Sequence, residues 1–224
     1  MVYNGRKAAG GMLRINEVFH AIQGESTFAG LPCVFVRLSG CDLRCTWCDT
    51  AYAFAEGDLR SIEEVVGDVQ AYGCSLVEIT GGEPLLQPDV YPLMARLIEA
   101  GETVLLETGG HRSLAQVPAA VVKVMDVKCP ASGQAHAMEW SNLGLLLPHD
   151  EVKFVIADRG DYEYARGIVQ AHGLDRRCHA VLFSPVHGVL DPSELASWVL
   201  ADRVPARVQL QLHKIIWGAG SRGT

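Results

Sequence analysis

Three cysteines, Cys41, Cys45 and Cys48, stand within a span of eight residues, directly after an apolar run at residues 34–38 that predicts a strand. Thiolates are soft ligands that select zinc or iron–sulfur centres. A structural zinc site closes with four protein ligands, usually as two separated pairs, and this chain has no second Cys-x-x-Cys or Cys-x-x-His pair. Most iron–sulfur clusters take four cysteines, so three would leave one iron open to another ligand. The spacing therefore favours an iron–sulfur cluster with one iron free for chemistry.

Three other interpretations of these cysteines are open: buried apolar residues, a redox pair with a bystander, or half of a zinc site completed by a distant histidine. A disulfide framework is not expected in a chain of this length without a secretion signal. The remaining cysteines stand singly, as core thiols usually do: Cys33, Cys74, Cys129 and Cys178. We favour the cluster because residues further along the chain also fit it.

The composition describes one medium-sized domain with a real core. The chain has 224 residues, of which 49% are hydrophobic and 20% charged, and its net charge is −7. This charge argues against a nucleic-acid partner, and no apolar stretch approaches the roughly 20 residues of a membrane span. Residues 1–11 are expected to be a disordered leader or an added remnant, and residues 12–224 a single domain. We expect the protein to be located in the cytoplasm, where thiols stay reduced.

Apolar β-branched runs alternate with helical segments along the chain. A capping box from Ser61 to Glu64 predicts one helix, and Asp191-Pro192 predicts the start of another. Further helices are expected at 88–101 and 161–172, and strands at 34–38, 76–80, 103–107, 121–125, 152–156, 180–183 and 207–212. This alternation predicts an α/β fold with a parallel sheet. Because there are fewer than eight units, an open, incomplete (β/α) barrel is favoured, with a doubly wound sheet as the alternative.

Polar residues follow the predicted strands, at the edge where parallel strands form their sites. These are Gly40-Cys41, Thr80 to Glu83, Glu107-Thr108, Asp126 to Lys128, Ser184 and His213-Lys214. The segment Gly81-Gly82-Glu83-Pro84 would let the backbone approach a ligand closely. Such a turn is common by itself and becomes specific only after a three-cysteine loop. Neither a His-x-x-x-His pair nor a Gly-x-Ser-x-Gly elbow supports a metalloprotease or a serine hydrolase.

Cys-x-x-x-Cys-x-x-Cys followed by Gly-Gly-Glu-Pro resembles the radical S-adenosylmethionine (SAM) superfamily. The resemblance implies a radical SAM type of open barrel, with a [4Fe–4S] cluster on Cys41, Cys45 and Cys48. It also implies that SAM binds the open iron and that one electron cleaves its sulfonium to give a 5′-deoxyadenosyl radical.

The segment from Glu17 to Ser26 resembles the start of the 7-carboxy-7-deazaguanine synthase family, and so do Cys48-Asp49-Thr50 and Gln211 to Trp217. The resemblance runs from Met12 to the C-terminus, although Ser26 stands where many members have glycine. It implies a lyase that converts 6-carboxy-5,6,7,8-tetrahydropterin to 7-carboxy-7-deazaguanine with loss of ammonia, in queuosine and related 7-deazapurine biosynthesis. SAM would be regenerated.

The same resemblance implies site residues, and no catalytic group beyond the cluster and SAM. SAM would contact Trp47, Cys48, Asp49, Gly82, Asp126, Val127 and Lys128. The pterin would contact Ile22, Gln23, Gly24, Arg37 and Thr80. Thr50 would bind Mg²⁺, and it could equally be a helix N-cap. Arg37 suits a carboxylate because its fork binds bidentately, with an ordinary salt bridge as its alternative.

A homodimer is expected from the family, with a small reducing protein such as a flavodoxin or ferredoxin as electron donor. Two other functions compete. One is a radical SAM activase of a glycyl-radical enzyme, and the other is a non-catalytic iron–sulfur or zinc protein. The segment Gln23-Gly24-Glu25 favours the small pterin over the activase's protein substrate.

Overall fold

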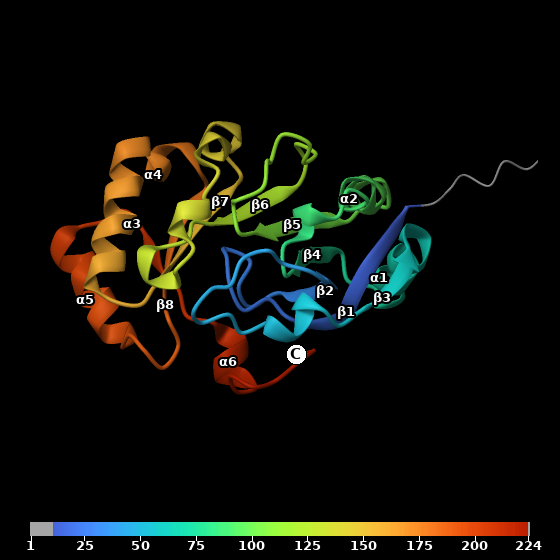
Figure 1. The fold of residues 1–224 in the computed structure, drawn as a ribbon, viewed down its shortest axis with the longest axis horizontal. Helices are drawn as coiled ribbons and strands as arrows, with labels where there is room; N and C mark the ends of the chain where they lie inside the picture. The colour runs from blue at the N-terminus through green and yellow to red at the C-terminus, as the bar shows by residue number, and fades with distance from the viewer. Residues whose placement is uncertain (1–10, 224) are drawn as a thin grey trace, which may run out of the picture.

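The computed structural model describes residues 11–223, so nearly all of the expected leader lies outside the described residues. These residues form a nine-stranded sheet in the order β3-β1-β2-β4-β5-β6-β7-β8-β9 (Figure 1). The strands are β1 (Met12–Ile22), β2 (Pro32–Leu38), β3 (Asp58–Ser61), β4 (Leu76–Gly81), β5 (Thr103–Thr108), β6 (Val122–Asp126), β7 (Glu151–Ile156), β8 (Ala180–Pro185) and β9 (Arg207–Val208).

The sheet is open and mainly parallel. Strand β1 pairs antiparallel with β2 and β3, and every pair from β2 to β9 is parallel. Strands β3 and β9 lie at its two edges, so the barrel does not close. From β4 onward each strand is added on the same side, whereas a doubly wound sheet reverses direction at a switch point. The prediction of an open, incomplete barrel is confirmed.

The helices are α1 (Ile62–Ala71), α2 (Val90–Glu99), α3 (Arg159–His172), α4 (Leu174–Arg177), α5 (Pro192–Asp202) and α6 (Leu212–Ile216). In Figure 1, α1 and α2 lie toward the β1 end of the sheet, and α3, α4 and α5 toward the β8 end. The capping box of α1 is present: Glu64 N donates to Ser61 Oγ and Ser61 N donates to Glu64 Oε2. Among the described residues, none of the helices has the length and apolar character needed to cross a membrane.

Three expectations for the strands were wrong. The short edge strand β3 was not predicted. The sequence pattern also missed β1, because its first side chains alternate between exposed and buried instead of forming a continuous apolar run. It also predicted a strand over 207–212, but β9 contains only Arg207 and Val208, and Leu212 begins α6. The chain leaves the sheet here because Leu212 N donates to Gly24 O, in the loop after β1. Helix α6 therefore lies next to the amino-terminal strands (Figure 1).

Candidate active site

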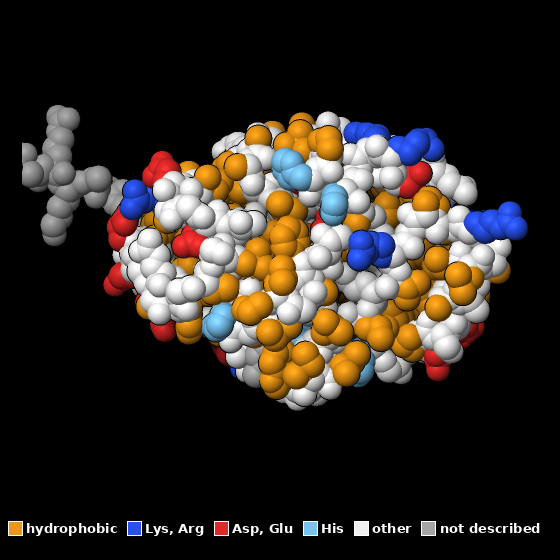
Figure 2. Space-filling model, turned by 180° about the vertical axis from the view of Figure 1, so that it is seen from behind, with side chains coloured by type: hydrophobic (Ala, Val, Ile, Leu, Met, Phe, Trp, Pro, Cys, Tyr) orange, Lys and Arg blue, Asp and Glu red, His pale blue; other side chains and the backbone are white. Residues whose placement is uncertain are grey.

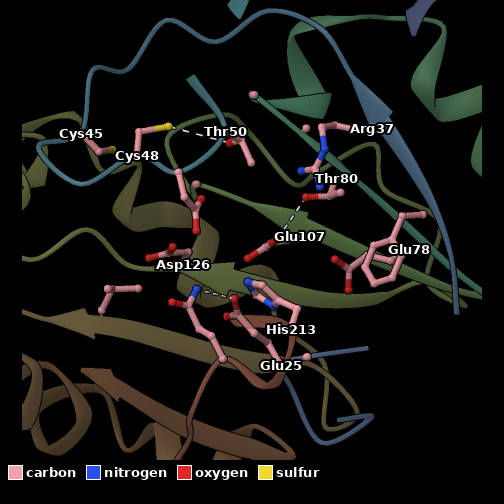
Figure 3. Close-up of a pocket in the computed structure, with 18 of the residues that line it drawn as sticks. Glu25, Arg37, Cys45, Cys48, Thr50, Glu78, Thr80, Glu107, Asp126 and His213 are labelled. Carbon is pink, nitrogen blue, oxygen red and sulfur yellow. Dashed lines mark hydrogen bonds between the residues drawn. The ribbon is translucent and has the colours of Figure 1, made fainter. Parts of the chain in front are cut away.

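A cavity of about 390 Å³ opens at the carboxyl ends of the parallel strands (Figure 3). The loop after β2 brings the three cysteines to it, and the ends of β4, β5 and β6 bring polar groups. Ser184 was expected at the same edge but does not line the cavity; its hydroxyl accepts a hydrogen bond from Gln209. The topology therefore gathers most of the strand ends as predicted; the residues that do not line the cavity are Gly40, Val127 and Ser184.

The cysteine loop places three free thiols in the cavity wall, each partly exposed. Burial raises the pKa of Cys41, and it also raises the pKa of Cys45 although the charge of Lys128 opposes it. Three soft donors on one loop match the ligand set of an iron–sulfur cluster. Across residues 11–223, no three His, Cys, Asp or Glu side chains gather as a single-ion site would require.

Gly82 is required by a close contact within the site. A Cβ on this residue would lie 2.2 Å from Gly40 O and 2.8 Å from Cys41 Cβ. The Gly-Gly-Glu segment can therefore pack directly against the base of the cysteine loop, and Glu83 N donates to Gly40 O. The Gly-Gly-Glu segment lies in the cavity wall, at the strand end where it was expected. Because Gly82 has no Cβ, the segment can pack against Cys41, the first of the three cysteines.

Asp126 and Lys128 lie opposite the cysteine loop in the cavity. Lys128 Nζ is 2.9 Å from Asp126 Oδ2, while the buried Asp126 Oδ1 has no hydrogen-bond partner. An unpaired buried acceptor is costly unless a ligand supplies a donor, so this atom fits the SAM contact expected of Asp126. Val127 does not line the cavity, and its N–H is already used by Lys153 O.

Lys153 is the centre of a charged cluster that the sequence did not reveal. Its Nζ lies 2.9 Å from Glu25 Oε2, 3.8 Å from Asp126 Oδ2, and in contact with Glu107 Oε1. Burial alone would raise the pKa of Glu107, but the Lys153 charge lowers it to about 2. Thr80 Oγ1 donates to the other oxygen of Glu107 at 3.0 Å. The cluster thus fixes the polar groups at one end of the cavity.

The end of β1 and the loop after it carry the expected pterin contacts Ile22, Gln23 and Gly24, and all three line the cavity. The Gln23 amide is held on both sides: it donates to the buried carboxyl of Glu78 and accepts from Glu25 N. Burial, with the negative charges of Glu107 and Glu25, raises the pKa of Glu78 to about 8. Gln23 therefore shapes the loop as well as facing the cavity.

Arg37 and Thr50 also line the cavity. Arg37 Nε lies 2.7 Å from Glu17 Oε1, which uses one donor and leaves the others of its fork for a ligand. Thr50 stands at the N-cap position of a short 3₁₀ helix (Ala51–Phe54), but its side chain makes no capping hydrogen bond. Its hydroxyl is 3.8 Å from Cys48 Sγ. The structure therefore lacks the side-chain hydrogen bond that the N-cap alternative for Thr50 requires.

Asp49 and Trp47, beside the third cysteine, complete the expected set. Asp49 Oδ2 lies 2.7 Å from Lys214 Nζ on α6. Burial would raise the pKa of Asp49, but the Lys214 charge lowers it below its usual value. Every residue predicted for the site except Val127 therefore lines one cavity. The sequence missed Glu78, Lys153 and His111; the first two carried a signal as lone charges inside apolar strands.

Comparison with known proteins defines the class. Residues 35–180 match the family model of the Radical SAM superfamily. The structure resembles that of QueE from Escherichia coli, with a TM-score of 0.74 and 22% identity, covering 89% of this chain and 94% of that one. It also resembles Streptococcus suis SuiB, with a TM-score of 0.59 and 14% identity, covering 76% of this chain and 46% of that one. The fold and the three-thiol site are those of a radical SAM protein, whose cofactors are a [4Fe–4S] cluster and SAM.

Curated relatives narrow the class. A protein from Koribacter versatilis is 48% identical, covering 94% of this chain and 100% of its own length. One from Chlorobaculum tepidum is 44% identical, covering 94% and 97%, and one from Methanospirillum hungatei is 40% identical, covering 91% and 85%. All three are named 7-carboxy-7-deazaguanine synthase. The chain belongs to the 7-carboxy-7-deazaguanine synthase family.

Proposed function

We propose that this protein converts 6-carboxy-5,6,7,8-tetrahydropterin to 7-carboxy-7-deazaguanine with loss of ammonia. The observation that carries the proposal is 48% identity over the full length of a relative with that name. The cavity supports it, because thiols for a cluster and polar groups for a small heterocycle line the same space. An activase would instead have to admit a segment of protein backbone.

The residues present fit the cluster and SAM. When bound, these cofactors supply the organic radical that begins the reaction. Cys41, Cys45 and Cys48 would hold the cluster. Trp47, Asp49, Gly82, Asp126 and Lys128 would surround SAM, with Asp126 Oδ1 available as an acceptor. Val127 would contribute only support, through its buried side chain and its hydrogen bond to Lys153 O.

Arg37 would bind the substrate carboxylate. Its guanidinium carbon lies 5.6 Å from the ring centre of Phe19 and 5.9 Å from that of Tyr52, which limits its orientations. Glu17 holds its Nε, so the remaining donors can form a bidentate contact. The substrate would also contact Ile22, Gln23, Gly24 and Thr80.

Thr50 would supply a hydroxyl ligand to Mg²⁺ beside that carboxylate. Mg²⁺ prefers oxygen ligands and keeps several waters, so a single threonine with a substrate oxygen is a reasonable protein contribution. Support comes from the hydroxyl, which lies in the cavity wall, makes no capping hydrogen bond and is 3.8 Å from Cys48 Sγ.

The proposal includes partners. A flavodoxin or ferredoxin would deliver the electron in a reducing cytoplasm, and the partly exposed thiols favour access for such a donor.

The chain would form a homodimer. Across the middle of the face in Figure 2 apolar side chains gather, with charged ones mostly toward its ends. Exposed apolar side chains also occur together near the C-terminus: Leu210, Ile215, Ile216 and Trp217.

The test is anaerobic incubation of cluster-loaded protein with SAM, a reductant and 6-carboxy-5,6,7,8-tetrahydropterin, followed by mass spectrometry. We expect 7-carboxy-7-deazaguanine, and no product when SAM is omitted. SAM cleavage without this product would retain the superfamily and reject the proposed substrate. An electron-paramagnetic-resonance signal that SAM does not change, or stoichiometric zinc in the purified protein, would favour a non-catalytic metal protein.

A further inference from the structure

The cysteine loop is attached to the sheet at three places, each beyond a different strand. At its start, Glu83 N after β4 donates to Gly40 O at 2.8 Å. Near its end, Thr46 N donates to Ser132 O at 3.1 Å, beyond β6. Between these, Asp42 contacts the segment that follows β5. The first and third attachments use backbone groups, whereas the middle one depends on side chains that a substitution can remove.

The middle attachment joins Asp42 to His111. His111 Nε2 lies 2.7 Å from Asp42 Oδ1, and Arg112 contacts the other carboxylate oxygen. The His111 side chain is only 4% exposed, whereas those of Asp42 and Arg112 are 40% and 44% exposed. Because a carboxylate only accepts hydrogen bonds, His111 Nε2 carries the proton between them. His111 is therefore the fixed member of this contact and Arg112 its solvent-exposed companion.

The histidine ring sits in a space formed by glycine and carboxylate. A Cβ on Gly109 would lie 3.0 Å from His111 Nδ1 and 3.3 Å from Glu83 Oε2. Nδ1 is 3.6 Å from Glu83 Oε2, is buried, and has no hydrogen-bond partner. Glu83 already accepts from Thr108 Oγ1 and Gly109 N, which hold it in place. The ring thus stands between the Gly-Gly-Glu segment and the cysteine loop.

We propose that His111 is a positioning residue that fixes the turn between the first two cysteines of the cluster loop through Asp42. The backbone attachments do not reach residues 42–44, although Gln134 Nε2, beyond β6, donates to Arg44 O at 3.3 Å. Loss of the His111 contact would leave Asp42 with only the exposed Arg112, which would loosen this turn and with it the separation of Cys41 from Cys45. The end of the loop would stay in place, because Thr46 keeps its own attachment to Ser132.

Trypsin cleavage after Arg44 tests the role of His111 in the full-length protein, kept reduced and free of the cluster. The rate of cleavage reports on the turn, because the protease reaches this bond only when the turn opens. We expect His111→Ala to speed cleavage about fivefold, as loss of one partly exposed charge-assisted hydrogen bond would. His111→Gln, whose amide N–H can replace Nε2–H, should cleave at nearly the parental rate. His149→Ala removes a histidine beside another aspartate, outside the cavity, and should leave this cleavage unchanged.

A second measurement follows cluster loss to an iron chelator, which His111→Ala should accelerate and His111→Gln should not. Equal cleavage after Arg44 in His111→Ala and parent would overturn the proposal, and so would equal acceleration at every arginine, which signals general destabilisation. A looser turn with unchanged cluster retention would also overturn it. The inference rests on the proposed cluster ligands, but the cleavage assay needs neither cluster nor substrate. Failure of the deazaguanine assay with these loop results intact would reject only the substrate.

Discussion

Lys153 Nζ lies 2.9 Å from Oε2 of Glu25, a residue 128 positions earlier in the chain. The contact joins β7 to the loop after β1, and the same ammonium meets Glu107 at the end of β5. Three elements are thus held at one end of the cavity by a single buried charge, whose partners Glu25 and Glu107 are labelled in Figure 3. A buried charge is tolerated only when it is paired, so these groups depend on one another.

Lys153→Met should disturb this end of the cavity by leaving Glu25 and Glu107 unpaired. We expect a loss of about 3–5 kcal/mol in the free energy of unfolding and weaker substrate binding. Urea denaturation measures the first and the KM for the pterin measures the second. Lys123→Met is the matched control, because it breaks the buried pair with Asp150 (2.8 Å) outside the cavity. It should lower stability without raising KM; equal KM effects in the two variants would contradict a specific role for Lys153.

The strand ends could be predicted from the sequence, because continuous apolar runs indicate buried strands whose following residues share one edge of the sheet. Thr80, Asp126 and Lys128 were placed correctly on this basis. Glu78 and Lys153 could not be placed, since each stands inside an apolar strand. Their partners, Gln23 and Glu25, lie 55 and 128 positions away, beyond the reach of any local pattern.

Two other features depended on tertiary contacts or backbone conformation. Residues 207–212 alternate like a strand, but the contact of Leu212 with Gly24 makes the chain leave the sheet. Ser26, where many family members have glycine, has a φ of 63°, in the left-handed region that favours glycine. Its N–H donates to Gln209 Oε1 at 2.7 Å, a contact that holds this conformation. The sequence showed the departure at Ser26 but not its conformational reason.

Glu78→Gln should change how stability depends on pH. The folded-state pKa of Glu78, about 8, lies above its ordinary value of 4.5, chiefly because the group is buried. The stability contributed by the protonated carboxyl is therefore complete below about pH 4.5 and is lost as pH rises toward 8, by at most about 1.4 kcal/mol per pH unit. Glutamine lacks this dependence. Urea denaturation from pH 5 to 8 should show the parent losing stability relative to the variant; a constant difference would mean that Glu78 titrates normally.

Arg37→Lys should weaken substrate binding while leaving SAM binding intact. Lysine keeps the charge but loses the bidentate fork, so we expect KM for the pterin to rise about 10- to 100-fold. The SAM-induced change in the cluster's electron-paramagnetic-resonance signal should persist. Glu17→Gln is a useful comparison, because it removes the charge that holds Nε but leaves the fork. An unchanged KM in Arg37→Lys would return Arg37 to the role of a salt-bridge residue.

Cys45→Ala should abolish both the cluster and turnover. Two thiolates cannot hold a [4Fe–4S] cluster in place of the proposed three, so iron content and visible absorption should fall to background. Cys178→Ala provides the control, since this buried cysteine does not line the cavity. That variant should keep the cluster. Full activity in Cys45→Ala would refute its assignment as a ligand.

Thr50→Ala should weaken the response of turnover to Mg²⁺ without preventing SAM cleavage. The hydroxyl is the proposed protein ligand, and its loss leaves Mg²⁺ only the substrate oxygens and water. Thr50→Ser retains a hydroxyl and should restore most of the response, which separates ligation from the packing of the threonine methyl group. Product formation measured over a Mg²⁺ titration, with 5′-deoxyadenosine followed in parallel, distinguishes these effects. If Thr50→Ala and the parent gave the same titration curve, Thr50 would not be a metal ligand. A weaker Mg²⁺ response in Thr50→Ala could not be attributed to a lost helix cap, because the side chain makes no capping hydrogen bond.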